Sequence, residues 1–90
     1  MIKISFSLLL RLSKFLDVHS LEGIRDEDAL RKLQQSPIDE FGVKHINILF
    51  NRQANICFCI LEAPNREAVE MHHEKYTIKC NWITEVETLD

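Results

Sequence analysis

The order in which strand-like and helix-like segments follow one another constrains the fold of this chain more than any other feature. Alternating or continuous apolar character, bounded by turn-forming residues, predicts strands at residues 15–19, 43–50, 56–62 and 82–87. Two helices are predicted between them, one starting near Asp26 and one near Pro64. The resulting order, β-α-β-β-α-β, is that of the ferredoxin-like plait. We therefore predict an α+β fold with a four-stranded antiparallel sheet and both helices on one face.

Local signals support the two helices. In the first, acidic Glu27 and Asp28 lie where a helix N-terminus favours negative charge, ahead of an apolar stripe of Ala29, Leu30 and Leu33. The second helix has an inward stripe at three-and-four spacing, formed by Ala68, Val69, His72, His73 and Tyr76. Between the first helix and the second strand, Ser36-Pro37 predicts a further short helical turn through Phe41 that stops at Gly42.

The length of the chain, 90 residues, leaves room for one hydrophobic core. We assign residues 14–88 to a single ferredoxin-like metal-binding domain and residues 1–13 to an N-terminal extension of unknown role. Lys and Arg number 11 against 14 Asp and Glu, which gives a formal net charge of −3. This balance removes the general attraction to phosphate backbones, so no nucleic-acid partner is expected.

The start of the chain resembles a signal peptide only in part. Its apolar run is interrupted by Arg11 and Lys14, no small-residue cleavage site follows, and the run is far shorter than the ~20 residues of a membrane span. The three cysteines are an odd number, and Cys57 and Cys59 are poorly placed to bridge each other. Reduced thiols in a cytoplasmic protein, with no membrane partner, are therefore expected.

The two faces of the first strand differ in chemistry. Leu16 and Val18 alternate with Phe15, Asp17 and His19, and we place the two aliphatic residues against the helices. On this interpretation the open face of the sheet carries the other three side chains, together with His45 and Asn47 of the second strand. Such a face needs solvent, a partner or a ligand to cover it, which favours a homodimer.

The topology brings several potential metal ligands toward one edge of the sheet. The first strand ends, the third and fourth strands begin, and the second helix ends at that edge, which brings together His19, Cys57, His72 or His73, and Cys80. Imidazoles and thiolates bind nickel, zinc and copper, and Asp17 or Glu62 could complete a shell. The spacing is not diagnostic, because Cys-x-Cys within a strand is more often part of a core, and a surface role for His19 is as plausible as ligation.

A set of short segments carries a resemblance to a known family. The most specific are the Asp-Val-His strand and the passage from Cys59 through Glu62-Ala63-Pro64 into the second helix; the others are Gly23, Gly42-Val43, Glu67-Ala68-Val69, His73 and Ile83-Thr84-Glu85-Val86. Together, from Lys14 to Val86, the chain resembles a small bacterial nickel-binding, nickel-responsive family with a ferredoxin-like fold.

The resemblance implies a homodimer that binds Ni²⁺ through nitrogen and oxygen ligands. Matching positions implicate His19, Asp17, Glu62 and His73 in binding, and Cys59 in the strand core. The family often has histidines where this chain has Gln34-Gln35 and Thr77-Ile78, so ligation could instead draw on His72, His45 or Cys80.

We therefore predict a small dimeric protein that binds a divalent transition metal, most favourably nickel, with zinc or another divalent ion as the alternative. A second hypothesis is a small enzyme or ligand-binding module that uses the open sheet face, with His19 and Asp17 as an acid–base pair. A third is an interaction module without a ligand. No Gly-x-Ser-x-Gly or Gly-rich phosphate loop is present, so the sequence does not indicate an enzyme.

Overall fold

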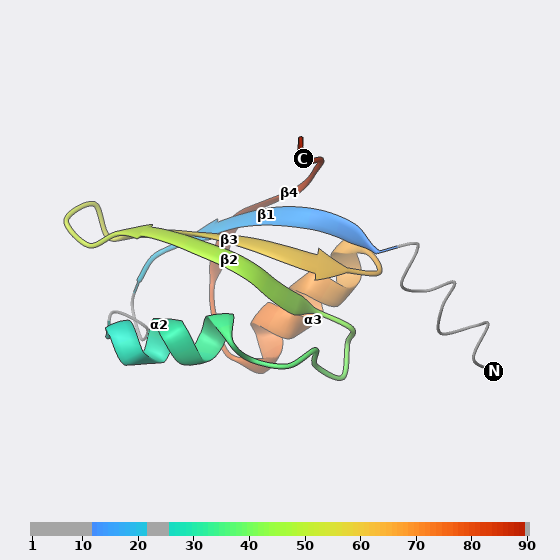
Figure 1. Ribbon diagram of the computed structural model, residues 1–90, viewed down its shortest axis with the longest axis horizontal. Helices are drawn as coiled ribbons and strands as arrows, with labels where there is room; N and C mark the ends of the chain where they lie inside the picture. The colour runs from blue at the N-terminus through green and yellow to red at the C-terminus, as the bar shows by residue number, and fades with distance from the viewer. Residues whose placement is uncertain (1–11, 22–25, 90) are drawn as a thin grey trace.

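The computed structural model describes residues 12–21 and 26–89 of the chain (Figure 1). Its elements are β1 (Ser13–His19), α2 (Glu27–Gln34), β2 (Lys44–Asn51), β3 (Ile56–Ala63), α3 (Arg66–Lys75) and β4 (Cys80–Val86). The strands form one antiparallel sheet in the order β2-β3-β1-β4, and both helices lie on the same side of it (Figure 1). The predicted ferredoxin-like plait is confirmed. Most of the predicted extension 1–13 lies outside the described residues.

The face of the sheet that carries the polar side chains of β1 is opposite to the predicted one. Phe15, Asp17 and His19 are all buried on the side of the helices, while Leu16 and Val18 are only half-buried on the open face. The partner strand explains the choice, because Asp17 pairs with Cys59 and Phe15 with Leu61, and β3 buries its own apolar residues on that side. Alternation separates two sets of side chains but does not say which set faces inward.

A β-bulge in β2 causes a second difference from prediction. The register of β2 against β3 shifts between His45 and Asn47, so that His45 shares the helix side with Ile48 instead of lying on the open face. His45 is 6% exposed, whereas Ile46, the residue at the bulge, is 40% exposed. Strict alternation predicted the wrong face for His45 because a bulge inserts one residue and reverses the phase of the strand.

The connections around the helices also differ in detail. The predicted helical turn through Phe41 does not form; a turn instead closes through the Gly42 N–H, which donates to the Asp39 carbonyl at 3.0 Å. Gly42 has a φ of +83°, a conformation that favours glycine. Asn65 caps α3, accepting from the Ala68 N–H at 2.8 Å, so Pro64 precedes the cap.

The hydrophobic core lies between the sheet and the helices. Its fully buried members include Val43, Cys57, Leu61, Val69 and Leu21, and the last was not predicted from the sequence. Burial of such side chains contributes about 1.5–3 kcal/mol each. Tyr76, predicted on the inward stripe of α3, is instead 48% exposed. No helix within the described residues is long and apolar enough to cross a membrane.

Candidate metal centre

Three neighbouring elements bring a group of titratable side chains into the interior. Asp17 and His19 come from β1, Cys57 and Cys59 face them from β3, and His73 reaches the same region from the last turn of α3. All five are buried, and none is more than 6% exposed. Polar side chains are rarely placed in a core of this size without partners, so each contact within the group is informative.

The ring of His19 has a defined tautomer. Its Nδ1 lies 2.8 Å from the carbonyl oxygen of Ser20, an acceptor, and therefore carries the proton. In the neutral ring Nε2 is then the nitrogen with the lone pair, and it lies 3.7 Å from Asp17 Oδ1 and 3.5 Å from Cys59 Sγ. A histidine held through one nitrogen by a backbone carbonyl, with the other nitrogen free to bind, has the arrangement of a metal ligand.

His73 is held in the same way. Its Nδ1 donates to the Val69 carbonyl at 2.8 Å, and its Nε2 lies 3.0 Å from Asp17 Oδ2. Burial lowers the pKa of His73, but the adjacent Asp17 carboxylate outweighs it, and the net pKa is raised. The two imidazoles thus direct their Nε2 atoms at one carboxylate.

Asp17 is the least satisfied of these groups. It is 0% exposed, and neither of its oxygens has an aligned hydrogen-bond donor among the described residues. An ionised carboxylate buried without hydrogen bonds is costly unless a cation lies beside it. That cation is either the protonated His73 ring or a metal ion. The ligand atoms of Asp17, His19 and His73 all lie within 4.8 Å of one another, close enough to hold one ion.

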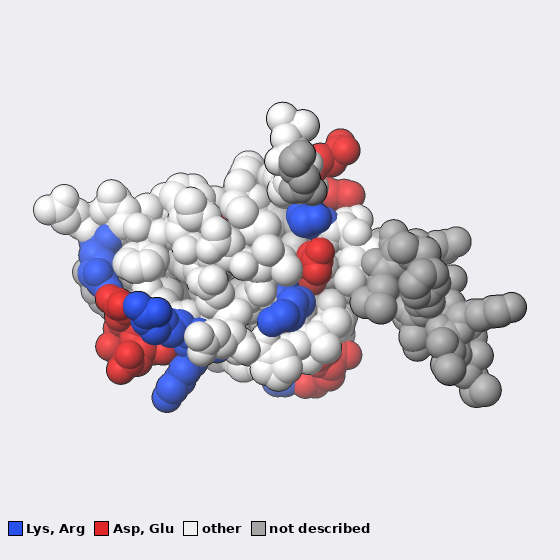
Figure 2. Space-filling view, in the orientation of Figure 1, with Lys and Arg blue, Asp and Glu red and all other residues white. Residues whose placement is uncertain are grey.

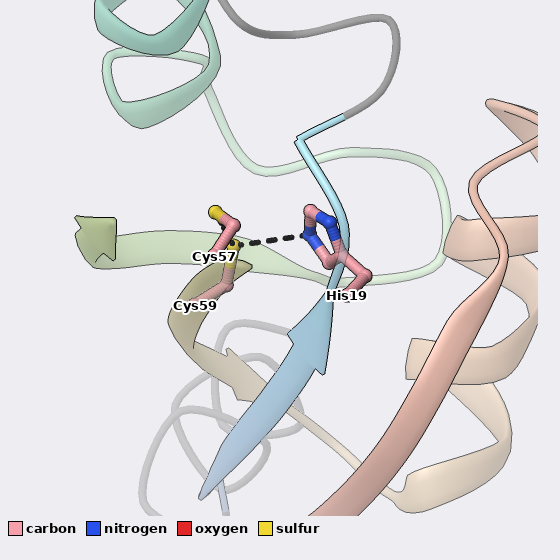
Figure 3. A group of neighbouring side chains, drawn as sticks. All are labelled: His19, Cys57 and Cys59. Atoms are coloured by element: carbon pink, nitrogen blue, oxygen red, sulfur yellow. Dashed lines mark hydrogen bonds between the residues drawn. The ribbon is translucent and has the colours of Figure 1, made fainter. Parts of the chain in front are cut away.

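The two buried thiols form a second group with the same histidine (Figure 3). Cys57 Sγ and Cys59 Sγ are 3.8 Å apart, and all three cysteines of the chain are free, as predicted. The contact with Cys57 and burial both raise the pKa of the Cys59 thiol, while the same contact lowers the pKa of Cys57. The sulfur and imidazole ligand atoms again lie within 4.8 Å of one another.

His72 belongs to a different arrangement. Its Nδ1 donates to Asp39 Oδ2 at 2.5 Å, and its ring lies 5.1 Å from the ring of His45. Burial and the neighbouring His72 lower the pKa of His45 to about 4. His72 was predicted as a ligand, but it is not in either of the two groups whose ligand atoms converge among the described residues.

The remaining sequence candidates lie elsewhere. Glu62 alternates with the buried Leu61 and Ala63 and therefore lies on the open face, where its carboxylate is 3.9 Å from Lys14 Nζ. Cys80 Sγ donates to the Trp82 carbonyl at 3.2 Å and is outside both groups. Neither Glu62 nor Cys80 joins the converging atoms.

The sequence analysis treated Cys57 and Cys59 mainly as core residues, whereas the structure places both beside His19. Asp17-x-His19 and Cys57-x-Cys59 have the same spacing of two, and β1 and β3 are adjacent, so all four side chains share one face. That matching spacing was the available signal, but it becomes informative only when the register pairs Asp17 with Cys59 and His19 with Cys57.

Comparison with known protein families identifies the family of this chain. The family model for SCO4226-like nickel responsive proteins matches residues 15–86, which run from within β1 to the end of β4. No curated protein and no solved structure gave a significant match. Because the family model covers most of the chain, the protein belongs to the SCO4226-like family of nickel responsive proteins.

Proposed function

We propose that this protein binds Ni²⁺, or a similar divalent transition metal, through Asp17, His19 and His73. The observation that carries the proposal is the buried Asp17 carboxylate, which has no aligned hydrogen-bond donor among the described residues and faces two imidazole nitrogens. An ion bound there would replace the proton of His73 as the counter-charge of the carboxylate.

The donor set suits the metal that the family name suggests. Imidazole nitrogen with carboxylate oxygen is a borderline set that binds Ni²⁺, Zn²⁺ and Cu²⁺, so the ligands alone do not select nickel. The membership in a nickel responsive family favours Ni²⁺ among these ions. The simplest competing interpretation is a purely structural ion pair between Asp17 and protonated His73, which would need no metal.

A surface pocket beside α3 reaches one of the proposed ligands, His73. A pocket of about 470 Å³ between α3 and β4 is lined by His73, with Arg66, Glu70 and Glu74 along its helical wall. His73 is 6% exposed, so it lies at the boundary between this pocket and the interior. An ion arriving through the pocket would meet the His73 ring first and the Asp17 carboxylate behind it.

We also propose that two subunits pair through the open face of the sheet in the cytoplasm. Leu49, Phe58, Val18 and Trp82 are paired in turn across β2, β3, β1 and β4 and form an apolar row on that face. In Figure 2 the charged side chains lie around the margin of a broad uncharged area. Three free thiols suit a reducing compartment.

Analytical ultracentrifugation of the full chain tests the proposed dimer. The parent protein should sediment as a dimer, and Trp82→Glu should weaken the dimer because it places a charge in the apolar row. A parent protein that sediments as a monomer would contradict this pairing.

The structure does not support an enzyme that uses His19 and Asp17 as an acid–base pair on the open face of the sheet. It required His19 and Asp17 on the open sheet face, where a substrate could reach them, but both are buried on the helix side. The pair is therefore available only to a proton or a small ion that enters through the interior.

Nickel binding can be tested with two neighbouring histidines of α3. His73→Gln should weaken Ni²⁺ binding by at least about tenfold in calorimetry of untagged protein. His72→Gln is the matched control, since His72 is equally buried but faces Asp39, and it should leave the affinity within a factor of about three. Circular dichroism would show that both variants fold. Equal affinities for the parent and His73→Gln would contradict the proposed ligand set.

A further inference from the structure

The Cys57 and Cys59 thiols take no part in the proposed nickel site, yet they lie against one of its ligands (Figure 3). We propose that Cys57, Cys59 and His19 form a second, thiolate-containing metal site that binds a thiophilic tetrahedral ion, represented by Zn²⁺. The Zn²⁺ site stands on its own geometry and does not require nickel to bind.

Two of the three distances between the ligand atoms match the edges of a tetrahedral coordination shell, and the third is below 4.8 Å. With zinc–sulfur bonds of about 2.3 Å and zinc–nitrogen bonds of about 2.0–2.1 Å, tetrahedral angles separate two sulfurs by about 3.8 Å and sulfur from nitrogen by about 3.6 Å. The observed Sγ–Sγ distance is 3.8 Å and the distance from Cys59 Sγ to His19 Nε2 is 3.5 Å. An ion could therefore bind with little movement of these side chains.

The histidine already has the protonation pattern of a ligand. Its Nδ1 proton is held by the Ser20 carbonyl, so the Nε2 lone pair is directed toward the sulfur atoms without a tautomer change. The backbone of β1 thereby orients the ring before any ion arrives. Cys57, Cys59 and His19 would supply three of the four positions of a tetrahedral shell.

Charge balance also favours an ion at the thiols. The two cysteines are 0% and 1% exposed, and burial disfavours an isolated thiolate there. A divalent cation balances the charge of the two thiolates, and the adjacent Asp17 carboxylate, which opposes thiolate formation at both cysteines, adds to the attraction for a cation. The two thiol protons pass to solvent buffer when the ion binds.

The two sites cannot be filled together. His19 Nε2 has one lone pair, and both groups of ligand atoms require it. This exclusivity rests on the proposed nickel site. Because a nitrogen–oxygen set and a sulfur set share His19, ligand softness would decide which ion the protein holds.

Cobalt(II) added to the reduced, untagged full chain tests the sulfur ligands directly, because thiolate ligation gives an intense sulfur-to-cobalt charge-transfer band that nitrogen and oxygen ligands do not. We expect the band in the parent protein and its displacement by Zn²⁺. Cys57→Ser and Cys59→Ser should each lose most of it and weaken Zn²⁺ binding by at least about tenfold. Cys80→Ser, the matched control outside the group, should keep the parent spectrum.

The cobalt spectrum of the parent protein tests for thiolate ligands even if a serine variant fails to fold. A parent protein that binds cobalt without a charge-transfer band, or that binds none, overturns the thiolate site. A band that survives in Cys59→Ser but disappears in Cys80→Ser also overturns it. His73→Gln separates the two proposals, since it should lose Ni²⁺ affinity while keeping the thiolate band. Nickel affinity unchanged in that variant would overturn the nickel site alone.

Discussion

Two carboxylates, the fully buried Asp17 and the half-buried Asp39, each face a histidine of α3, but their surroundings differ. Asp39 accepts hydrogen bonds from the N–H groups of Phe41 at 2.9 Å and Val43 at 3.0 Å, and from His72 at 2.5 Å. Burial opposes ionisation of Asp39, yet these hydrogen bonds lower its pKa. Asp17 is close to His73 but has no aligned donor among the described residues.

The difference separates Asp39, a structural carboxylate, from Asp17, which we propose as a metal ligand. Asp39 fixes the turn before β2 and anchors His72, so its bonding capacity is used within the fold. The oxygens of Asp17 accept no aligned hydrogen bond within the described residues, so their lone pairs are available to an ion. Leaving them without donors lowers the stability of the ion-free protein. The same helix thus carries one histidine that holds a turn and one that completes a candidate metal site.

The largest expected effect is on the Asp39 side and depends on pH. His45, beside His72, is neutral in the folded protein because its pKa is lowered from 6.5 to about 4. Its contribution to stability is therefore present above pH 6.5 and is lost as the pH falls toward 4. The loss should approach about 3 kcal/mol in urea unfolding, at about 1.4 kcal/mol per pH unit. His45→Gln should flatten this slope, and an unchanged slope would contradict the assignment.

A pair of matched substitutions compares what the two carboxylates contribute to the free energy of unfolding. Asp39→Asn should lower the free energy of unfolding by about 2 kcal/mol, because charged hydrogen bonds become neutral ones. Asp17→Asn should change the stability of the ion-free protein by less than about 1 kcal/mol, since it removes a buried charge that has no aligned donor. Denaturant unfolding without metal checks both. Equal losses would remove the distinction between the two sites.

A smaller effect is expected at alkaline pH on the Asp17 side. The raised pKa of His73 means that its stabilising contribution is full below the unfolded value of 6.5 and is lost as the pH rises through the folded pKa. Deprotonation then leaves the Asp17 carboxylate without a counter-charge. Saturating Ni²⁺ should suppress this alkaline loss of stability, because the ion replaces the proton. An alkaline loss of the same size with and without Ni²⁺ would argue against an ion beside Asp17.

The element order, and the presence of Asp17, His19 and His73 among the candidate ligands, could be predicted from the sequence. Which face of each strand lies against the helices could not. The short alternating run from Phe15 to His19 defines two sets of side chains, but only pairing with Cys57, Cys59 and Leu61 shows that the polar set is inside. His45 was misplaced because no sequence signal marks the bulge beside it.

The separation of His72 from His73 also required the structure. Adjacent helical residues point about 100° apart, so the sequence shows that they face different neighbours without showing which. His72 meets Asp39 only because a turn replaces the predicted helical segment before Gly42. Glu62 matched a family pattern, but strand alternation places it on the open face.

The most direct test of the account is nickel binding by Asp17→Asn compared with Asp39→Asn. We expect the parent protein and Asp39→Asn to bind Ni²⁺ with similar affinity in equilibrium dialysis at neutral pH. Asp17→Asn should weaken binding by about a hundredfold, because the only carboxylate in the ligand group is lost. Undiminished nickel binding by a folded Asp17→Asn protein would contradict the claim that this buried carboxylate is a metal ligand.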